Sequence, residues 1–127
     1  MKRANVYDLG SEEFGPYRQI ALLFKRALER KGVCVHKKGE SPQPGTISLR
    51  TFTQSQGIHY QQIWQLLRGL SIPLPEKTLL YCKAVGMTNP DEIQLALLLS
   101  IKARLPETYQ HIFDSVIDAL WKNLQVE

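Results

Sequence analysis

A short segment in the middle of the chain carries five polar side chains whose hydrogen-bonding groups suit the edges of nucleic-acid bases. They are Tyr60, Gln61, Gln62, Gln65 and Arg68. In the major groove of DNA, a glutamine amide matches the edge of adenine and an arginine guanidinium matches that of guanine. Residues 41–75 contain no aspartate or glutamate, so no carboxylate there would repel the phosphates of a duplex. Glutamine is also simply a soluble helix former, but the set as a whole favours base readout.

Two short helices are predicted to position these side chains. Ser48 is a typical N-cap for a helix over residues 49–56, and Gly57 ends that helix. A second helix runs from residue 59 or 60 to 68, and Gly69 ends it. A helix this short is not stable alone in water, so neighbouring elements must hold it. The apolar positions expected to face inward are Leu49, Phe52, Ile58, Ile63, Leu66 and Leu67.

Residues 48–69 resemble, without a gap, the helix-turn-helix of lambda-repressor-like DNA-binding domains of the Cro/Xre type. Gly57 stands at the turn glycine of that family, and Ile63 and Leu66 stand at its paired apolar positions. The order of the flanking segments extends the resemblance over residues 16–86. The resemblance implies an all-α fold: a five-helix lambda-repressor-like helix-turn-helix domain, here with an enlarged loop after the first helix and an extra C-terminal helix.

The resemblance also implies how the chain would contact double-stranded DNA. Its base-reading positions are Tyr60, Gln61, Gln62 and Gln65. Positions expected to contact phosphate, or to act in a secondary role, are Ser48, Arg50, Gln54, His59 and Arg68. Among these, His59 either caps the second helix or contacts a phosphate. Apart from the resemblance, Lys37 and Lys38 of the loop after the first helix are further candidates for such contacts. Proteins of this type usually bind palindromic sites as two-fold dimers.

Two departures from the family pattern stand out. Thr53 occupies a close contact between the two helices where the family usually has alanine, and threonine is still small enough to fit. The loop after the first helix, residues 33–47, is longer than usual and basic. Its Lys37 and Lys38 could reach a phosphate or the minor groove, and the alternative is a surface insertion that costs little stability.

Proline and glycine divide the rest of the chain into further helices. Gly15-Pro16 opens a helix that ends before Gly32, and residues 33–35 could form a short strand or hairpin. Asn89-Pro90 starts another helix, and Pro106 begins the last one. Before both of these, Pro75 starts a helix with Leu79, Leu80, Cys82 and Val85 expected on one side. We therefore expect about six helices and no convincing sheet.

The predicted domain organisation follows from these proline and glycine positions. Residues 1–15 form an N-terminal arm, residues 16–105 the DNA-binding domain, and residues 106–127 a C-terminal helix. That last helix carries an apolar stripe, which either packs on its own domain or pairs with a second copy. We favour a homodimer through Ile112, Phe113, Val116, Ile117, Leu120, Trp121 and Leu124.

Composition excludes several functional classes. The chain has 127 residues, 43% hydrophobic and 22% charged, which suits one small globular domain and neither a disordered nor a repetitive chain. Residues 1–90 carry thirteen Lys/Arg and six Asp/Glu, a net charge of +7, whereas residues 91–127 carry −3. This asymmetry favours a polyanion as partner of the first part. No signal peptide or membrane span is recognisable, so we expect a cytoplasmic, nucleoid-associated protein without membrane contact.

The sequence contains no residue pattern typical of a catalytic site or a cofactor-binding site. The two cysteines, Cys34 and Cys82, are far apart and lack partners at zinc-binding spacing, so we expect no metal, and Cys82 should be a small buried hydrophobe. No nucleophile with a base and no glycine-rich phosphate loop is present, so an enzyme is not expected.

Three functions remain open at this point. The first is a sequence-specific transcriptional regulator. The second is an antitoxin that also represses its own promoter, with the C-terminal helix binding a toxin. The third is a protein-interaction module that keeps the fold without binding DNA.

Overall fold

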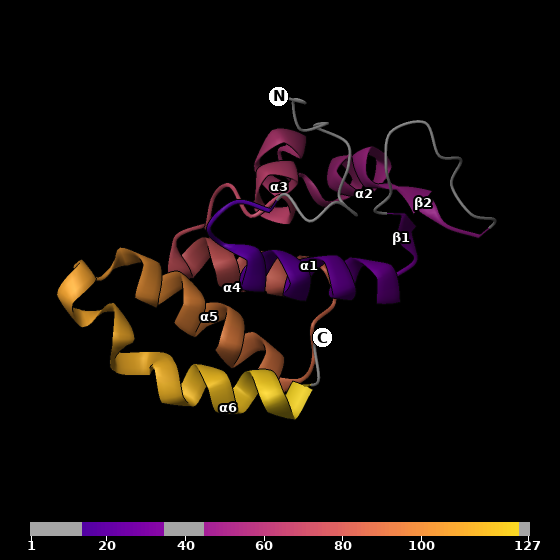
Figure 1. The fold of residues 1–127 in the computed structure, drawn as a ribbon. Coiled ribbons are helices and arrows are strands. Elements are labelled where there is room, and N and C mark those ends of the chain that lie inside the picture. The colour runs from indigo at the N-terminus through magenta and orange to yellow at the C-terminus, as the bar shows by residue number, and fades with distance from the viewer. Residues whose placement is uncertain (1–13, 35–44, 125–127) are drawn as a thin grey trace, which may run out of the picture. The chain divides into compact units, whose positions relative to one another are not determined.

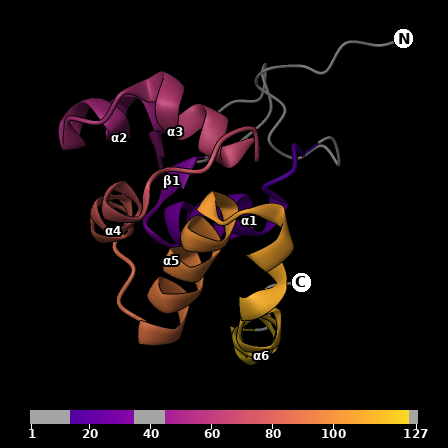
Figure 2. The same ribbon diagram turned by 90° about the vertical axis from the view of Figure 1, so that its left-hand side faces the viewer.

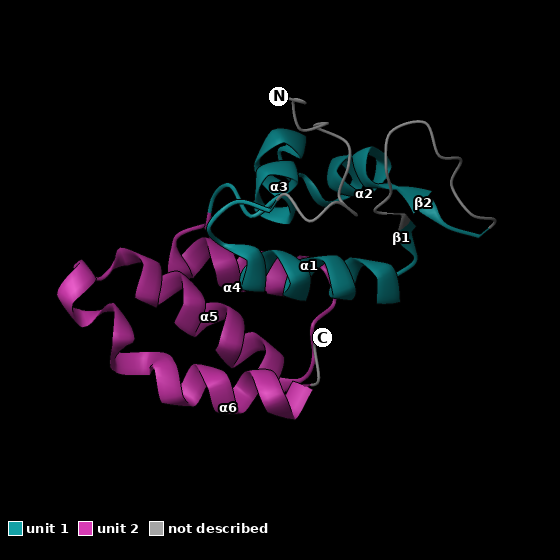
Figure 3. Cartoon of the chain, in the orientation of Figure 1, with its two compact units in different colours: residues 1–71 teal, residues 72–127 magenta. Residues whose placement is uncertain are grey.

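The computed structural model describes residues 14–34 and 45–124, and over these ranges it is mostly helical, as predicted (Figure 1). It contains six α-helices, one 3-10 helix and two strands of two residues each. The chain divides into two compact units, residues 1–71 and residues 72–127 (Figure 3). Lys37 and Lys38, predicted to reach DNA, lie outside the described residues, as does most of the predicted N-terminal arm.

The first unit contains one long helix and the helix pair that carries the glutamines. Helix α1 spans Arg18–Arg30 and buries Ile20, Ala21, Leu23, Phe24, Ala27 and Leu28. Strands β1 (Val33–Cys34) and β2 (Ile47–Ser48) pair in parallel, with Val33 opposite Ile47. This small pair joins the two ends of the predicted loop insertion. Helices α2 (Leu49–Gln56) and α3 (Tyr60–Leu67) follow, packed against each other, with α3 also packed against α1.

A close backbone approach joins the segment just before α1 to the end of α3. The amide of Gly15 donates to the carbonyl of Arg68 at 2.9 Å, and the amide of Tyr17 donates to the carbonyl of Gly69 at 3.0 Å. A Cβ atom at position 15 would lie 2.4 Å from the carbonyl oxygen of Gly69. Only glycine therefore fits at position 15 without moving the backbone.

The second unit is built from three α-helices and a 3-10 helix. Helix α4 spans Pro75–Ala84, α5 spans Pro90–Arg104, the 3-10 helix η1 spans Glu107–Phe113, and α6 spans Asp114–Leu124. Both α4 and α6 pack against α5 (Figure 2). The predicted start of α5 is confirmed: Pro90 is its first residue, and the Asn89 side chain accepts a hydrogen bond from the Asp91 amide at 2.9 Å.

Three side chains of the second unit hold the segment that precedes α4. Arg104 donates to the carbonyl of Ile72 at 2.7 Å. Ser100 and Thr78 both donate to the carbonyl of Pro73, at 2.5 Å and 3.3 Å. Ser100 and Thr78 are fully buried, so these bonds satisfy hydroxyl groups that would otherwise destabilise the core.

Two predictions about the second unit are wrong. Leu79 and Leu80 are exposed rather than inward, because the buried side of α4 is formed by Thr78, Tyr81 and Cys82 at helical spacing. The last α-helix begins at Asp114 rather than just after Pro106, because residues 107–113 form the 3-10 helix.

The apolar stripe predicted to pair with a second copy is divided between core and surface. Ile117, Leu120 and Leu124 are buried, whereas Ile112 and Val116 are exposed. Phe113 and Trp121 are half-buried. Much of the stripe therefore packs within the chain's own second unit, which is one of the two outcomes considered from the sequence.

Cys82 is a buried thiol, as predicted. Its side chain is almost inaccessible, and burial, together with the nearby Glu92 carboxylate, raises the pKa of Cys82 to about 12. Since the thiolate is the reactive form, Cys82 is chemically inert in the folded chain.

Candidate nucleic-acid interface

The first helix of the pair, α2, is fixed at its start by its own side chains. The Ser48 hydroxyl accepts a hydrogen bond from the Thr51 amide at 3.1 Å and donates to the Thr51 hydroxyl at 2.9 Å. This confirms Ser48 as the N-cap of α2. Leu49 and Phe52 are buried, as predicted.

Thr53, the departure from the family pattern, fits at a buried position of α2. Its side chain is 1% exposed, and its hydroxyl donates to the Arg50 carbonyl one helical turn earlier at 2.9 Å. A hydroxyl that is satisfied within its own helix can be buried without a large penalty. Threonine therefore takes the place expected for alanine without needing another partner.

A left-handed glycine makes the turn between α2 and α3. Gly57 has a φ of 67°, its amide donates to the Gln54 carbonyl at 3.3 Å, and the Ile58 amide donates to the Thr53 carbonyl at 2.9 Å. These two bonds form the Schellman motif, which ends a helix with its last carbonyls satisfied. The predicted turn is confirmed.

The second helix, α3, separates apolar and polar side chains on opposite sides. Ile63, Leu66 and Leu67 are buried, as predicted, and Trp64, for which no position was predicted, is buried with them. The exposed side chains are Gln61, Gln62 and Gln65, and Tyr60 is half-buried. Three of the four predicted base-reading residues therefore lie on the surface of the first unit.

Arg68 does not lie on that surface, so its predicted outward position is wrong. It is 5% exposed, and its guanidinium carbon lies 5.5 Å from the centroid of the Trp64 ring, one helical turn earlier. An arginine four residues after a tryptophan can fold back over that ring. Arg68 is therefore a packing residue at the end of α3, not a surface contact.

His59 is the N-cap residue of α3, but its imidazole makes no capping hydrogen bond. Its backbone carbonyl accepts from the amides of Gln62 and Ile63, both at 3.2 Å. His59 therefore occupies the predicted cap position through its backbone alone, and the alternative for His59, a phosphate contact, stays a prediction.

Arg50 and Tyr60 join the starts of the two helices. The guanidinium carbon of Arg50 lies 4.3 Å from the centroid of the Tyr60 ring, within the range of a cation–π interaction. Arg50 is exposed in the first turn of α2, and Gln54 is exposed one turn later. Both residues were predicted to contact phosphate, and both are on the surface.

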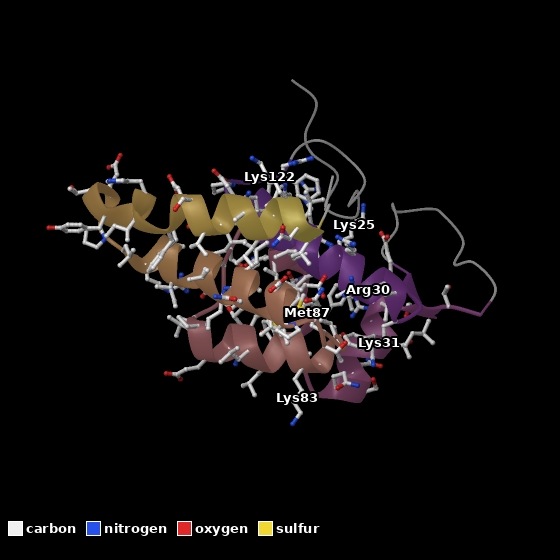
Figure 4. The ribbon with its side chains drawn as sticks, turned by 90° about the horizontal axis from the view of Figure 1, so that it is seen from below. Lys25, Arg30, Lys31, Lys83, Met87 and Lys122 are labelled. Carbon is white, nitrogen blue, oxygen red and sulfur yellow. The ribbon has the colours of Figure 1, made fainter. Side chains whose placement is uncertain are left out.

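The sequence of the first unit has a net positive charge. Residues 1–71 contain eleven Lys/Arg and five Asp/Glu, a net charge of +6. Within the described part of this unit, Glu29 of α1 is the one carboxylate. Further cations of this unit are Lys25 and Arg30 of α1 and Lys31 directly after it, all labelled in Figure 4.

Comparisons with protein-family models, curated proteins and solved structures each found no match. Over the described residues, no helix is long and apolar enough to span a membrane, and no three His, Cys, Asp or Glu side chains gather in a metal-binding arrangement. The function proposed below is therefore inferred from the residues of α2 and α3.

Proposed function

We propose that this protein is a sequence-specific double-stranded DNA-binding protein of the lambda-repressor-like helix-turn-helix type, which reads bases through α3 and regulates transcription. The observation that carries the proposal is the division of α3 into a buried apolar side and an exposed side with three glutamines. Such a helix fits the major groove, where glutamine amides bind adenine. The absence of carboxylates from residues 41–75 removes repulsion from the phosphates.

The spacing of the exposed amides limits the site that could be read. Gln61 and Gln65 are one helical turn apart, a rise of about 6 Å along the helix. Stacked bases are about 3.4 Å apart along each strand, so the two amides could reach base pairs about two steps apart. We expect a bound half-site with two nearby positions that prefer adenine.

Selection of bound sequences from random duplex DNA tests this proposal directly. We expect enrichment of a short motif, and fluorescence anisotropy should then show much tighter binding to the motif than to a scrambled duplex of the same length. Binding should weaken steeply with salt, because released counterions contribute to the affinity. No enrichment, together with no binding to any duplex at low salt, would show that the proposal is wrong.

A double substitution locates the reading surface. Gln61→Ala with Gln65→Ala should abolish the preference for the selected site and leave the weaker binding to a scrambled duplex. Gln94→Ala with Asn123→Ala is a matched control, because it removes two exposed amides from α5 and α6 of the second unit. We expect the control to keep full selectivity; full selectivity in the α3 variant would mean that another surface reads the bases.

We also propose that the protein binds DNA as a homodimer through the second unit. Ile112 and Val116 are 57% and 37% exposed, although both are large apolar side chains. Burying such residues against a second copy would be favourable and would match a two-fold DNA site. Light scattering over a dilution series should give the dimer mass at high concentration, and a monomer at high micromolar concentration would exclude this arrangement.

A further inference from the structure

Arg50 and Tyr60 form a stacked pair whose role goes beyond holding two helices together. They lie in the first turns of α2 and α3, ten positions apart in the sequence, and the Gly57 turn brings them into contact. Tyr60 is half-buried and Arg50 is exposed, so the ring is the anchored member of the pair and the guanidinium is the member that faces solvent.

The Tyr60 ring, whose centroid lies 4.3 Å from the guanidinium carbon, occupies one side of the group. The N–H groups, which lie in the plane of the guanidinium, can be reached by a ligand from the solvent side. Among the described residues, no carboxylate forms an ion pair with Arg50, whose described contact is the Tyr60 ring. A planar guanidinium with unused donors matches a phosphate, which it can bind through two parallel hydrogen bonds. The ring also restricts the rotamers of a long, flexible side chain, so less conformational entropy is lost when a phosphate binds.

The position of the pair indicates which phosphate it would bind. Tyr60 is the first residue of α3, and Gln61, the first of the exposed amides, follows it directly. A guanidinium stacked on Tyr60 therefore lies at the end of α3 from which the reading side chains begin. A phosphate held there would set the register of α3 on the duplex, since backbone contacts fix orientation and base contacts supply specificity.

We propose that Tyr60 is a positioning residue that holds Arg50 for a backbone phosphate of the bound duplex, rather than a base-reading residue. This inference rests on the proposed DNA-binding function and changes the role assigned to Tyr60 from the sequence. Its aromatic face is in contact with Arg50, and what it contributes to DNA binding passes through that guanidinium.

A double-mutant cycle on a selected duplex tests the inference. Arg50→Met should lower affinity and reduce the slope of log K against log salt by about 0.9, the value for one lost phosphate contact. Tyr60→Leu should lower affinity about threefold to tenfold and shift the slope in the same direction, because an unstacked arginine binds the phosphate less often. Tyr60→Phe, which keeps the ring, should behave like the unsubstituted protein.

Base preference separates positioning from readout. Tyr60→Leu should leave the selected motif unchanged, and it should have no further effect when Arg50→Met is already present. A changed motif, or equal losses from Tyr60→Leu with and without Arg50, would overturn the inference. A protein that binds no duplex at low salt would instead overturn the proposed function, so the two failures are distinguishable.

A measurement on the unsubstituted protein covers the case in which Tyr60→Leu does not fold. In an NMR titration with the selected duplex, the Nε–H signal of Arg50 should start shifted by the ring current of Tyr60 and move strongly as DNA saturates the protein. An Arg50 signal that does not respond to saturating DNA would overturn the inference, whatever the behaviour of the variants.

Discussion

Helices α3 and α4 end in the same way, but the side chains that they expose differ in polarity. Each is followed by a glycine with positive φ, 70° at Gly69 and 79° at Gly86, and each has the pair of amide-to-carbonyl bonds that ends a helix after such a glycine. Yet α3 exposes glutamines, whereas α4 exposes Leu79 and Leu80, which are 44% and 63% accessible.

The two units also differ in the sign of their net charge. Residues 1–71 have a net charge of +6, whereas residues 72–127 carry five Lys/Arg and seven Asp/Glu, a net charge of −2. An acidic unit with exposed leucines suits a protein partner, and a basic unit with exposed amides suits a nucleic acid. The difference teaches that the helix frame alone does not assign function here; the side chains on its exposed side do.

The largest expected effect comes from placing a single negative charge on α3 of the first unit. Gln65→Glu changes an exposed amide of α3 into a carboxylate of nearly the same shape, which cannot donate to adenine and repels the phosphates. We expect DNA affinity to fall by about a hundredfold, measured by fluorescence anisotropy.

Gln94→Glu is the matched control in the second unit, because Gln94 is exposed on α5. The same charge there should change affinity by about twofold or less, since it lies outside the proposed interface. Equal losses in the two variants would show that overall charge, rather than the side chains of α3, governs binding.

The local frame of the proposed site was predictable because each of its signals is local. A serine at the N-cap, a glycine at each helix end and apolar residues at helical spacing predict the bounds of α2, the turn and α3 from neighbouring residues alone. The exposure of the glutamines follows from the same periodicity.

What the sequence did not predict depends on contacts made in three dimensions. Arg68 has the charge of a surface residue, but it is 5% exposed and its guanidinium lies beside the Trp64 ring. Leu79 and Leu80 have the hydrophobicity of core residues, but Thr78 takes the inward position because its hydroxyl binds the Pro73 carbonyl. The Arg50–Tyr60 stack joins two helices, so neither helix pattern alone indicates it.

A smaller effect is expected where the backbone of the first unit meets the end of α3. Gly15→Ala would place a Cβ atom 2.4 Å from the Gly69 carbonyl oxygen and force the backbone apart. We expect a loss of about 2–3 kcal/mol in the free energy of unfolding, measured by urea denaturation, together with weaker DNA binding as the end of α3 shifts.

Gly57→Ala is the control with which the stability loss of Gly15→Ala is compared. A Cβ atom at position 57 would meet nothing within 4 Å, so the cost is the positive φ alone, about 1 kcal/mol. If Gly15→Ala costs no more than Gly57→Ala, the contact between residues 15 and 69 does not hold α3 in place.

The smallest effects are expected from removing the two side-chain caps, one in each unit. Ser48 caps α2 and Asn89 caps α5, each by accepting a hydrogen bond from an amide in the first turn, so Ser48→Ala and Asn89→Ala should each lower the free energy of unfolding by about 1 kcal/mol. Since the expected loss of unfolding free energy is the same in the two variants, a difference in their DNA affinity would come from where each cap lies and not from global stability. We expect Ser48→Ala alone to weaken binding at temperatures where both variants are folded, because fraying the start of α2 moves Arg50. If Asn89→Ala weakened binding equally, the second unit would contribute to the interface, and the functional contrast between the units would be lost.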